Sequence, residues 1–299
     1  AEGQRLVRGS STPGKLRQSC GGVGRNIAEA LGRLGVRCAL VSAVGDDAQA
    51  RQLLDATQAA GVDVSRVATI PGCTTATFTA VMDEAGDLVA AVADADVLKR
   101  VDPDVVKDCA SDVRAARAVL VDGNIGVEAL GAVARVCEAY DTQLWFEPTS
   151  VPKAVAPVKA GLLSSLDVVT PSADELVAML EAALELDLLR EHRAGVQRLL
   201  LRSASPASVA SPADVSTHRQ LAVALLRAMA PTPRQRPRRH VVATLGALGL
   251  VWAGPAEALP RRCAVDDLVG VLHRPPPAQR SAGGGVTGAG DALAAGVLW

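Results

Sequence analysis

The sequence is poor in aromatic residues, with three Trp, two Phe and one Tyr in 299 residues. Proteins that bind single-stranded nucleic acid usually stack the bases on aromatic side chains, so we do not expect a nucleic-acid partner. The formal net charge of −1 gives no electrostatic reason for binding nucleic acid or an anionic membrane. Composition and charge therefore give no reason to expect nucleic acid or a membrane as partner.

Paired cysteines are also missing. The six cysteines are scattered, and none belongs to a CxxC pair or has a His at zinc-ligand spacing: Cys20, Cys38, Cys73, Cys109, Cys137 and Cys263. This usage is typical of a reducing compartment, so we expect a cytoplasmic location and no zinc site. Organellar targeting stays open, because the chain begins at Ala1 rather than Met. Apolar runs that reach the ~18 residues needed to cross a bilayer are absent from the sequence.

The composition, 49% hydrophobic and 21% charged, is that of a globular protein. From residue 113 onward, short apolar segments alternate with helical patterns, which predicts an α/β fold with a mostly parallel sheet. Ligands of such sheets bind at the carboxyl ends of the strands. The polar residues expected at those ends are Asp122, Asn124, Glu147 and Thr149.

The N-terminal part predicts two helices, over 27–34 and 49–60, with a strand over 36–44 between them. Alternating residues over 74–82 and 88–92 predict a β-hairpin with one wet face, which often stands off the main sheet as a flap. Residues 194–240 are rich in Ala, Ser and Pro, and we expect a loop-rich insertion there.

A further hairpin is expected over 241–252, with its turn at 246–249. Close backbone approach at Gly246 and Gly249 could admit a nucleotide, or the turn could be purely structural. Ser172 and Glu175 fit a capping box, Ser172 as N-cap and Glu175 three residues later. Glu175 could also hold magnesium through water, and the two roles are compatible.

The motif with the clearest chemical meaning lies near the end of the chain. It is a turn of small residues that leads into an Ala- and Leu-rich helical run, and it consists of Gly288, Ala289, Gly290 and Asp291. Unpaired N–H groups at a helix start bind anions such as phosphate. A carboxylate beside them could serve as the base for phosphoryl transfer to a hydroxyl. The alternative is that Asp291 is an ordinary acidic residue at a helix start.

Three other glycine-rich stretches partly resemble nucleotide-binding motifs. Residues 9–16 are one residue short of a P-loop, because Leu16 stands where a magnesium-binding Ser or Thr is needed. Residues 21–26 precede a helix but do not follow a strand, unlike a dinucleotide fingerprint. Residues 283–288 fit GxGxxG, which would suggest an oxidoreductase, but no acidic residue follows about 20 positions later.

Two long signatures, about 260 residues apart, resemble those of the PfkB (ribokinase-like) carbohydrate kinases. The first consists of residues 21–28 with Gly35 and Gly45 after it, and the second of residues 286–291 with Ala295 and Gly296. The resemblance implies a three-layer α/β/α sandwich with a mostly parallel central sheet and a small β lid around 13–20 and 73–96.

Within that family the chain most resembles eukaryotic-type pseudouridine kinases. Five segments carry this likeness: 12–15, 75–81, 93–96, 121–125 and 146–153. Some of these kinases are fused to a pseudouridine-5′-phosphate glycosidase. The resemblance therefore implies ATP-dependent phosphorylation of pseudouridine, with Mg²⁺ as cofactor, and it leaves open a monovalent cation, a homodimer and such a fusion.

The resemblance also implies a role for each matching position. Asp291 would be the base, and Gly288, Ala289 and Gly290 would form the anion hole. The ribose would contact Gly21, Gly22 and Asn26. The ATP site would be lined by Thr244, Gly246 and Gly249, with Glu175 in the magnesium network.

The chain departs from the family pattern in ways that keep alternatives open. The family's first strand, which carries an Asp for the sugar hydroxyls, has no counterpart before residue 21, and the chain stops at Trp299, inside the helix that follows Asp291. Ser172 and Gly285 replace the family's usual residues. We expect a single kinase domain over 1–299 truncated at both ends. The alternatives are a catalytically inactive fragment or binding module, or another sugar kinase of the ribokinase or adenosine kinase type.

Overall fold

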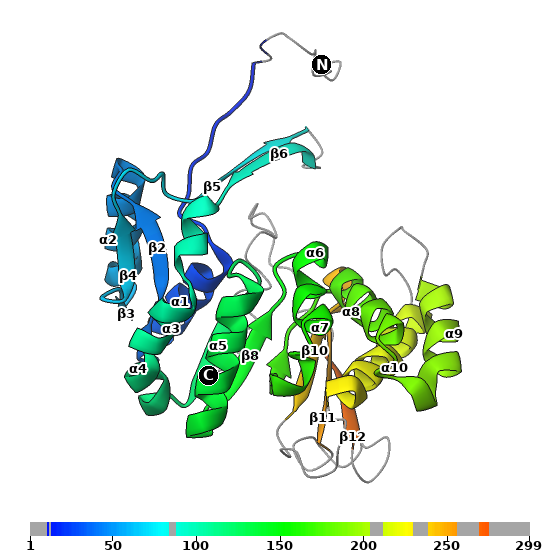
Figure 1. The fold of residues 1–299 in the computed structure, drawn as a ribbon. Helices are drawn as coiled ribbons and strands as arrows, with labels where there is room; N and C mark the ends of the chain where they lie inside the picture. Colours follow the sequence, from blue (N-terminus) through cyan, green and yellow to red (C-terminus); the bar gives the residue numbers. More distant parts are fainter. Residues whose placement is uncertain are drawn as a thin grey trace. The chain divides into compact units, whose positions relative to one another are not determined.

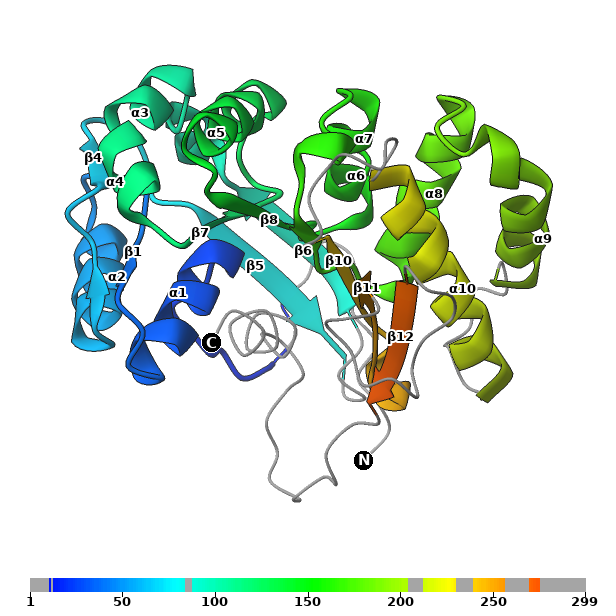
Figure 2. The same cartoon turned by 90° about the horizontal axis from the view of Figure 1, so that it is seen from below.

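The computed structural model describes residues 11, 13–83, 88–203, 212–229, 239–255 and 269–274. The chain divides into two compact units, the first ending at Arg100 and the second beginning at Val101. Figures 1 and 2 show the elements of both units. The expectation of one kinase domain over residues 1–299 stays a prediction.

Two amphipathic helices begin the first unit. They are α1 (Val23–Arg33) and α2 (Ala48–Ala59), close to the two helices that the sequence predicts. In α1, Ile27 and Leu31 lie one helical turn apart and are buried. The helix ends before Gly35, whose φ of 80° is the left-handed conformation that favours glycine after a helix.

Two pairs of short parallel strands complete the body of this unit. β1 (Cys38–Ala39) pairs with β3 (Val62–Asp63), and β2 (Ser42–Gly45) pairs with β4 (Val67–Ile70). The single strand expected over 36–44 is therefore two strands, because its two halves pair with different partners.

The predicted hairpin is confirmed as the antiparallel pair β5 (Thr77–Met82) and β6 (Leu88–Asp94), followed by the short helix η1 (Asp96–Arg100). Figure 1 shows it as a long cyan ribbon. The expectation that only one face of the hairpin is exposed to solvent is wrong. Phe78 is 67% exposed and every residue of β5 is exposed, so its apolar side is open to solvent as well. A strand buries one side only where a second layer covers it.

A six-stranded mixed sheet forms the centre of the second unit, in the order β12-β11-β10-β9-β8-β7. Figure 2 labels β7, β8, β10, β11 and β12 of this sheet. The strands are β7 (Ala118–Asp122), β8 (Gln143–Glu147), β9 (Val168–Val169), β10 (His240–Thr244), β11 (Leu250–Pro255) and β12 (Val269–Arg274). The pairings from β7 to β10 are parallel, and the two pairings of β11 are antiparallel. The mostly parallel sheet and the hairpin expected over 241–252 are thus confirmed.

Eight α-helices are described in the second unit: α3 (Pro103–Asp108), α4 (Ala110–Ala115), α5 (Val127–Tyr140), α6 (Val151–Ala154), α7 (Ala156–Lys159), α8 (Ala173–Glu185), α9 (Arg193–Ser203) and α10 (Pro212–Met229). Three short helices are also present: η2 (Leu163–Ser165), η3 (Arg190–His192) and η4 (Gly246–Leu248). Leu176 of α8 and Leu225 of α10 are fully buried with Val241 of β10 in one apolar core. In the ranges that the structure describes, no helix is long and apolar enough to cross a bilayer.

The loop-rich insertion expected over 194–240 is wrong for most of the described residues in that range. Residues 193–203 and 212–229 form α9 and α10, and α10 packs on α8 and on strands β10 and β11. Leu221 and Met229 of α10 have no exposed surface. Burial of this apolar face stabilises the helix more than local propensity, which explains why composition alone did not predict it.

The loop expected over 194–240 would leave its arginines at 234, 236, 238 and 239 in solvent. Arg234, Arg236 and Arg238 lie outside the described residues, but Arg239 is buried at 5% exposure. Its Nη2 donates a hydrogen bond of 2.7 Å to the carbonyl oxygen of Ser164. For Arg239 the expectation is therefore wrong, because a backbone carbonyl takes the place of water around its guanidinium.

Candidate functional site

The predicted site residues fall into three groups. Asp291 and the predicted anion hole, Gly288, Ala289 and Gly290, lie outside the described residues. The predicted sugar-binding residues belong to the first unit, and the predicted nucleotide and magnesium residues belong to the second. These two groups therefore lie in different compact units.

The predicted sugar-binding segment is the glycine pair that begins α1. Gly22 is the N-cap and has a φ of 102°, a conformation that side chains with a Cβ rarely adopt. Gly21 is exposed, and no described atom lies within 4 Å of the position that a Cβ would occupy there. Both glycines therefore leave the backbone accessible beside the positive end of a helix.

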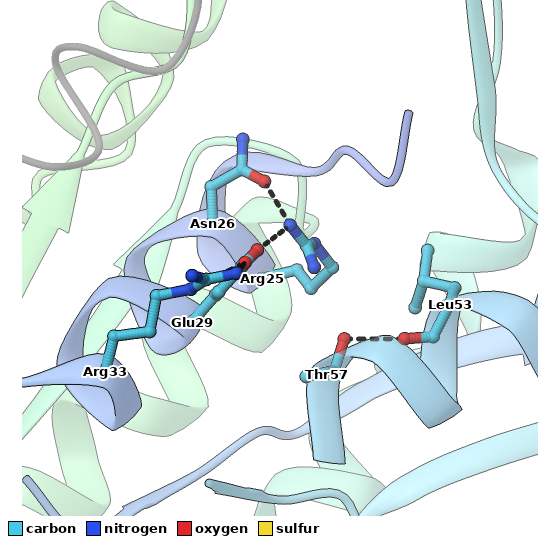
Figure 3. A network of polar contacts seen from close by, with 6 residues as sticks. All are labelled: Arg25, Asn26, Glu29, Arg33, Leu53 and Thr57. Carbon is cyan, nitrogen blue, oxygen red and sulfur yellow. Dashed lines mark hydrogen bonds and ion pairs between the residues drawn. The ribbon is translucent and has the colours of Figure 1, made fainter. Parts of the chain in front are cut away.

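Behind this segment, the side chains of α1 form a polar network (Figure 3). Arg25 Nη2 donates to Asn26 Oδ1 at 2.9 Å and also to Glu29 Oε2. Arg33 donates to the other oxygen, Glu29 Oε1, from Nη2 at 2.6 Å and from Nε at 3.0 Å. Burial would raise the pKa of Glu29, but the hydrogen bonds and charges of Arg33 and Arg25 outweigh it and lower the pKa below its ordinary value. Glu29 is therefore ionised at neutral pH.

Asp47 fastens the base of the hairpin to the start of α2. Its carboxylate accepts hydrogen bonds from the Thr75 backbone N–H at 2.7 Å and the Thr75 hydroxyl at 2.6 Å, and from the Ala50 N–H at 2.8 Å. The Thr75 hydroxyl also accepts from the N–H of Gly45 at 3.1 Å. A Cβ on Gly45 would lie 2.2 Å from the carbonyl oxygen of Cys73, so the chain passes too close for a side chain. Sequence reasoning missed this anchor; its signal was the Gly-Asp-Asp turn directly after a strand.

In the second unit, the loops after β7 and β8 interlock. The Gly123 N–H donates to the carbonyl of Glu147 at 2.8 Å and to the hydroxyl of Thr149 at 3.1 Å. A Cβ on Gly123 would lie 2.3 Å from the carbonyl oxygen of Pro148, and Thr149 itself has a φ of 70°. A non-glycine residue in this conformation is unusual and is held in place by the surrounding contacts.

A chain of polar contacts follows from this junction. Asp122 accepts hydrogen bonds from the backbone N–H and the side-chain amide of Asn124, both at 2.9 Å. Lys153 in turn donates to Asn124 Oδ1. The sequence correctly places polar residues at the carboxyl ends of these strands. It did not single out Lys153, which adds a positive charge at the same edge.

The next strands along the sheet bring the predicted N-cap Ser172 beside Thr244, a predicted nucleotide-binding residue. Ser172 and Thr244 form a parallel bridge that extends the pairing of β9 and β10. Ser172 and Glu175 form the predicted capping box: the Ser172 N–H donates to Glu175 Oε2 at 2.7 Å, and Ser172 Oγ accepts from the Glu175 N–H at 3.4 Å. Glu175 is buried at 7% exposure. The capping role is confirmed, and the magnesium role stays a prediction.

The turn after β10 contains the other two predicted nucleotide-binding residues. Gly246 has a φ of 53° and Gly249 a φ of 89°, and the Leu245 N–H donates to the carbonyl of Gly249 at 2.7 Å. No described atom lies within 4 Å of a Cβ at Gly246. The turn therefore needs glycine for its conformation and offers open backbone at the same edge as Thr244.

Among the residues that the structure describes, no group of three or more His, Cys, Asp or Glu side chains is placed to hold a metal ion. Mg²⁺ is commonly held by one or two carboxylates together with water and substrate phosphates, so it does not need such a group. Glu175, in the first turn of α8 at the carboxyl edge of the sheet, fits that requirement.

A family model described as pfkB family carbohydrate kinase matches residues 4–299. The chain is also similar to curated proteins. Pseudouridine kinase of Escherichia coli (strain K12) is 32% identical over 145 residues, which cover 48% of this chain and 46% of that protein. Pseudouridine kinase of Arabidopsis thaliana is 28% identical over 206 residues, which cover 67% of this chain and 53% of that protein.

A third relative is the pseudouridine-metabolizing bifunctional protein of Schizosaccharomyces pombe. It is 28% identical over 174 residues, which cover 58% of this chain and 23% of that protein. The chain spans about half the length of the E. coli and Arabidopsis relatives that it matches.

Solved structures show the same fold at low identity. Ribokinase from Cryptococcus neoformans var. grubii serotype A in complex with ADP is 18% identical, with a TM-score of 0.69 and coverage of 98% of this chain and 82% of that one. Arabidopsis thaliana ribokinase complexed with ribose and ATP is 18% identical, with a TM-score of 0.68 and coverage of 97% and 78%. The fold is therefore ribokinase-like α/β, as the sequence predicts.

Proposed function

Because the chain belongs to the pfkB family of carbohydrate kinases, we propose that the protein transfers the γ-phosphoryl group of ATP to a hydroxyl of a sugar or nucleoside. The proposed acceptor is pseudouridine, and the product is pseudouridine 5′-phosphate. The observation that carries the proposal is the family match over residues 4–299. The names of the E. coli and Arabidopsis relatives support the choice of acceptor.

Asp291 is the proposed base. It takes the proton from the 5′-hydroxyl while that oxygen forms a bond to the γ-phosphorus, and the bond from this phosphorus to ADP breaks. The backbone N–H groups of Gly288, Ala289 and Gly290 donate to the phosphoryl oxygens, on which charge is concentrated in this reaction. This assignment is based on the motif and its match to the family signature.

Gly21, Gly22 and Asn26 are the proposed contacts to the sugar. Open backbone at the glycine pair and a half-buried amide one turn into α1 support this role. The hairpin of β5 and β6 is the proposed lid. An apolar side that is open to solvent suits an element that covers a bound molecule, and exclusion of water strengthens polar contacts in a closed site.

Thr244, Gly246 and Gly249 are the proposed nucleotide contacts, and Glu175 is the proposed magnesium residue, acting through water. The Ser172–Thr244 bridge supports this grouping, since it connects the start of α8 to the end of β10. Bound Mg²⁺ would neutralise charge on the phosphates. Lys153, at the carboxyl edge of the same sheet, supports an anionic ligand on this side of the second unit.

The S. pombe relative supports an extension of the proposal. Its name describes a bifunctional protein that metabolises pseudouridine. We propose that this kinase is joined to a pseudouridine-5′-phosphate glycosidase. Such a fusion would place two steps on the same nucleoside phosphate in one polypeptide.

The experiment that tests the proposal is ADP release with magnesium-ATP and pseudouridine, compared with uridine, ribose and no acceptor. We expect release above background with pseudouridine. Asp291→Asn should lower turnover by about 10²–10⁴-fold, the usual contribution of a general base. Asp55→Asn, at an exposed position of α2, is the matched control and should leave turnover unchanged. Undiminished turnover of Asp291→Asn would remove the proposed base, and release with ribose alone would overturn the proposed acceptor.

A further inference from the structure

Arg25 is a buried cation directly beside a predicted sugar-binding residue. Its side chain is 8% exposed, and its Nη2 atom donates to both Asn26 Oδ1 and Glu29 Oε2. Its Nε finds no hydrogen-bond acceptor among the residues that the structure describes. The guanidinium is thus held through its Nη2 edge, between the Asn26 amide and the Glu29 carboxylate (Figure 3).

This contact determines which way the Asn26 amide faces. A guanidinium has only donors, so the amide atom that meets Arg25 must be the oxygen. Figure 3 shows the Asn26 amide nitrogen pointing away from Arg25. The orientation therefore follows from chemistry and does not depend on which amide atom is assigned as oxygen.

The guanidinium is itself held in place. Glu29 accepts from Arg25 on one oxygen and from Arg33 on the other, at spacings of four residues along α1. A buried charge with a paired partner loses less freedom when it forms a further hydrogen bond than a mobile surface side chain does. Arg33 is different, because it is 70% exposed and its contacts here are to Glu29 alone.

We propose that Arg25 is a positioning residue of the acceptor site: it holds Asn26 so that the amide nitrogen is presented as a hydrogen-bond donor to a hydroxyl oxygen of the sugar. The inference rests on the proposed function, which assigns Asn26 to the sugar. It adds a residue that does not itself touch the substrate, and it assigns the direction of the Asn26 hydrogen bond.

The first test separates positioning from general stability. Arg25→Met keeps an unbranched side chain in place of the aliphatic stem and removes the donors, while Glu29 keeps Arg33 as its partner, so the variant should fold. We expect its KM for pseudouridine to rise about tenfold, the effect of losing one net hydrogen bond, with the KM for ATP unchanged. Arg33→Met removes the other ion pair of Glu29 and should leave both KM values unchanged. Equal changes in the two variants, or an equal rise in both KM values of Arg25→Met, would overturn the proposal.

The second test needs no change at Arg25. Asn26→Asp places an oxygen where the amide nitrogen stood, so the donor to the sugar is lost, as it is in Asn26→Ala. We expect Asn26→Asp to raise the KM for pseudouridine at least as much as Asn26→Ala. A smaller rise in Asn26→Asp than in Asn26→Ala would show that an acceptor at this position suffices for the sugar, which contradicts the inferred donor role of the amide nitrogen.

A third measurement does not depend on turnover. The side-chain amide resonances of Asn26 in an NMR spectrum can be identified by their loss in Asn26→Asp. They should shift in Arg25→Met, shift less in Arg25→Lys, which keeps a donor, and stay in place in Arg33→Met. Unshifted resonances in Arg25→Met would overturn the positioning role. If the wild-type chain released no ADP with any acceptor, the proposed function would fail while this measurement still decided the role of Arg25.

Discussion

Asp47 and Thr75 lie 28 residues apart in the sequence and are joined by two hydrogen bonds, one to the backbone and one to the side chain of Thr75. The same carboxylate caps α2 through the N–H of Ala50. One side chain therefore ties the start of a helix to the chain that enters the hairpin. If the hairpin is the lid of the proposed kinase, Asp47 fixes its base to the first unit.

Replacement of Asp47 should loosen that base. In Asp47→Ala we expect faster amide hydrogen exchange over 74–94, because the contacts that hold Thr75 are lost. Exchange in the second unit should not change. Asp46→Ala is a matched control, since among the described residues the neighbouring carboxylate accepts a hydrogen bond from the N–H of Gly72 and none from Thr75. Unchanged exchange over 74–94 in Asp47→Ala would show that the hairpin is held by other contacts.

The same carboxylate should make stability depend on acid pH. The side-chain hydrogen bond from Thr75, followed by the backbone bonds from Thr75 and Ala50, lowers the pKa of Asp47 below its ordinary value of ~3.9. The stabilisation is therefore complete above that value and is lost as the pH falls through the lower, folded-state pKa. Thermal unfolding between about pH 5 and pH 2 should show a smaller loss of Tm in Asp47→Ala than in the wild type. An equal loss of Tm in Asp47→Ala and the wild type over this pH range would contradict the prediction.

Gly45→Ala should destabilise the first unit. The added methyl group would lie 2.2 Å from the carbonyl oxygen of Cys73, so the loop before the hairpin must move. We expect a loss of about 1–3 kcal/mol in the free energy of unfolding, as for overpacking elsewhere. Urea denaturation gives this value. Gly14→Ala, where no described atom lies within 4 Å of the new Cβ, is the control and should show no comparable loss.

His240 should make the second unit sensitive to mild acid. Burial lowers the pKa of His240, and the negative charge of Asp167 offsets only part of this effect. Its Nδ1 accepts a hydrogen bond from Trp252 Nε1 at 3.0 Å, which a neutral ring can do. The unfolded chain therefore takes up the proton more readily than the folded one. Stability should fall as the pH drops below ~6.5, by at most about 1.4 kcal/mol per pH unit, and level off below the folded-state pKa.

His240→Gln keeps an acceptor for Trp252 and removes the titrating group. Its Tm should change less between about pH 7 and pH 5 than that of the wild type. His192→Gln, at an exposed position in η3, is the control and should retain the wild-type dependence. An unaltered dependence in His240→Gln would assign the effect to another group.

Two variants separate the structural and chemical roles of Glu175. Glu175→Gln keeps a side chain that can complete the capping box, so the free energy of unfolding should change by less than about 0.5 kcal/mol. Turnover should fall, and its magnesium dependence should shift to higher concentration, because a charge is lost. Ser172→Ala should do the reverse: it removes the N-cap at a cost of about 1 kcal/mol and keeps the magnesium dependence. A purely structural Glu175 would leave the magnesium titration of Glu175→Gln unchanged.

Local patterns in the sequence predicted several of the elements. The apolar spacing of Ile27 and Leu31, the capping box at Ser172 and the hairpin around Gly246 all depend on neighbours within a few residues, and all are present in the structure. The halves of the strand expected over 36–44 pair with different partners, which no local pattern reveals. α10 is stabilised by packing on strands elsewhere in the sequence, so the composition of its segment wrongly predicted a loop.

In the candidate site, too, some features could be predicted from the sequence, while contacts between distant segments could not. Polar residues at the carboxyl ends of the strands were expected from topology, and the bridge between Ser172 and Thr244 joins the predicted N-cap of α8 to a predicted nucleotide-binding residue. The contacts of Lys153 with Asn124 and of Asp47 with Thr75 join segments 20 or more residues apart. Such pairs depend on how the loops pack against each other, and local patterns in a single sequence do not show which distant residues come into contact.

The position of β9 in the sheet has a consequence for how the chain folds. Its neighbour on one side, β8, is made shortly before it, but its neighbour on the other side, β10, follows only after residues 170–239. During synthesis, one edge of β9 therefore stays without its native partner while α8, α9 and α10 are made. An unpaired strand edge invites association with other chains. Folding of the second unit should thus be limited by the arrival of β10.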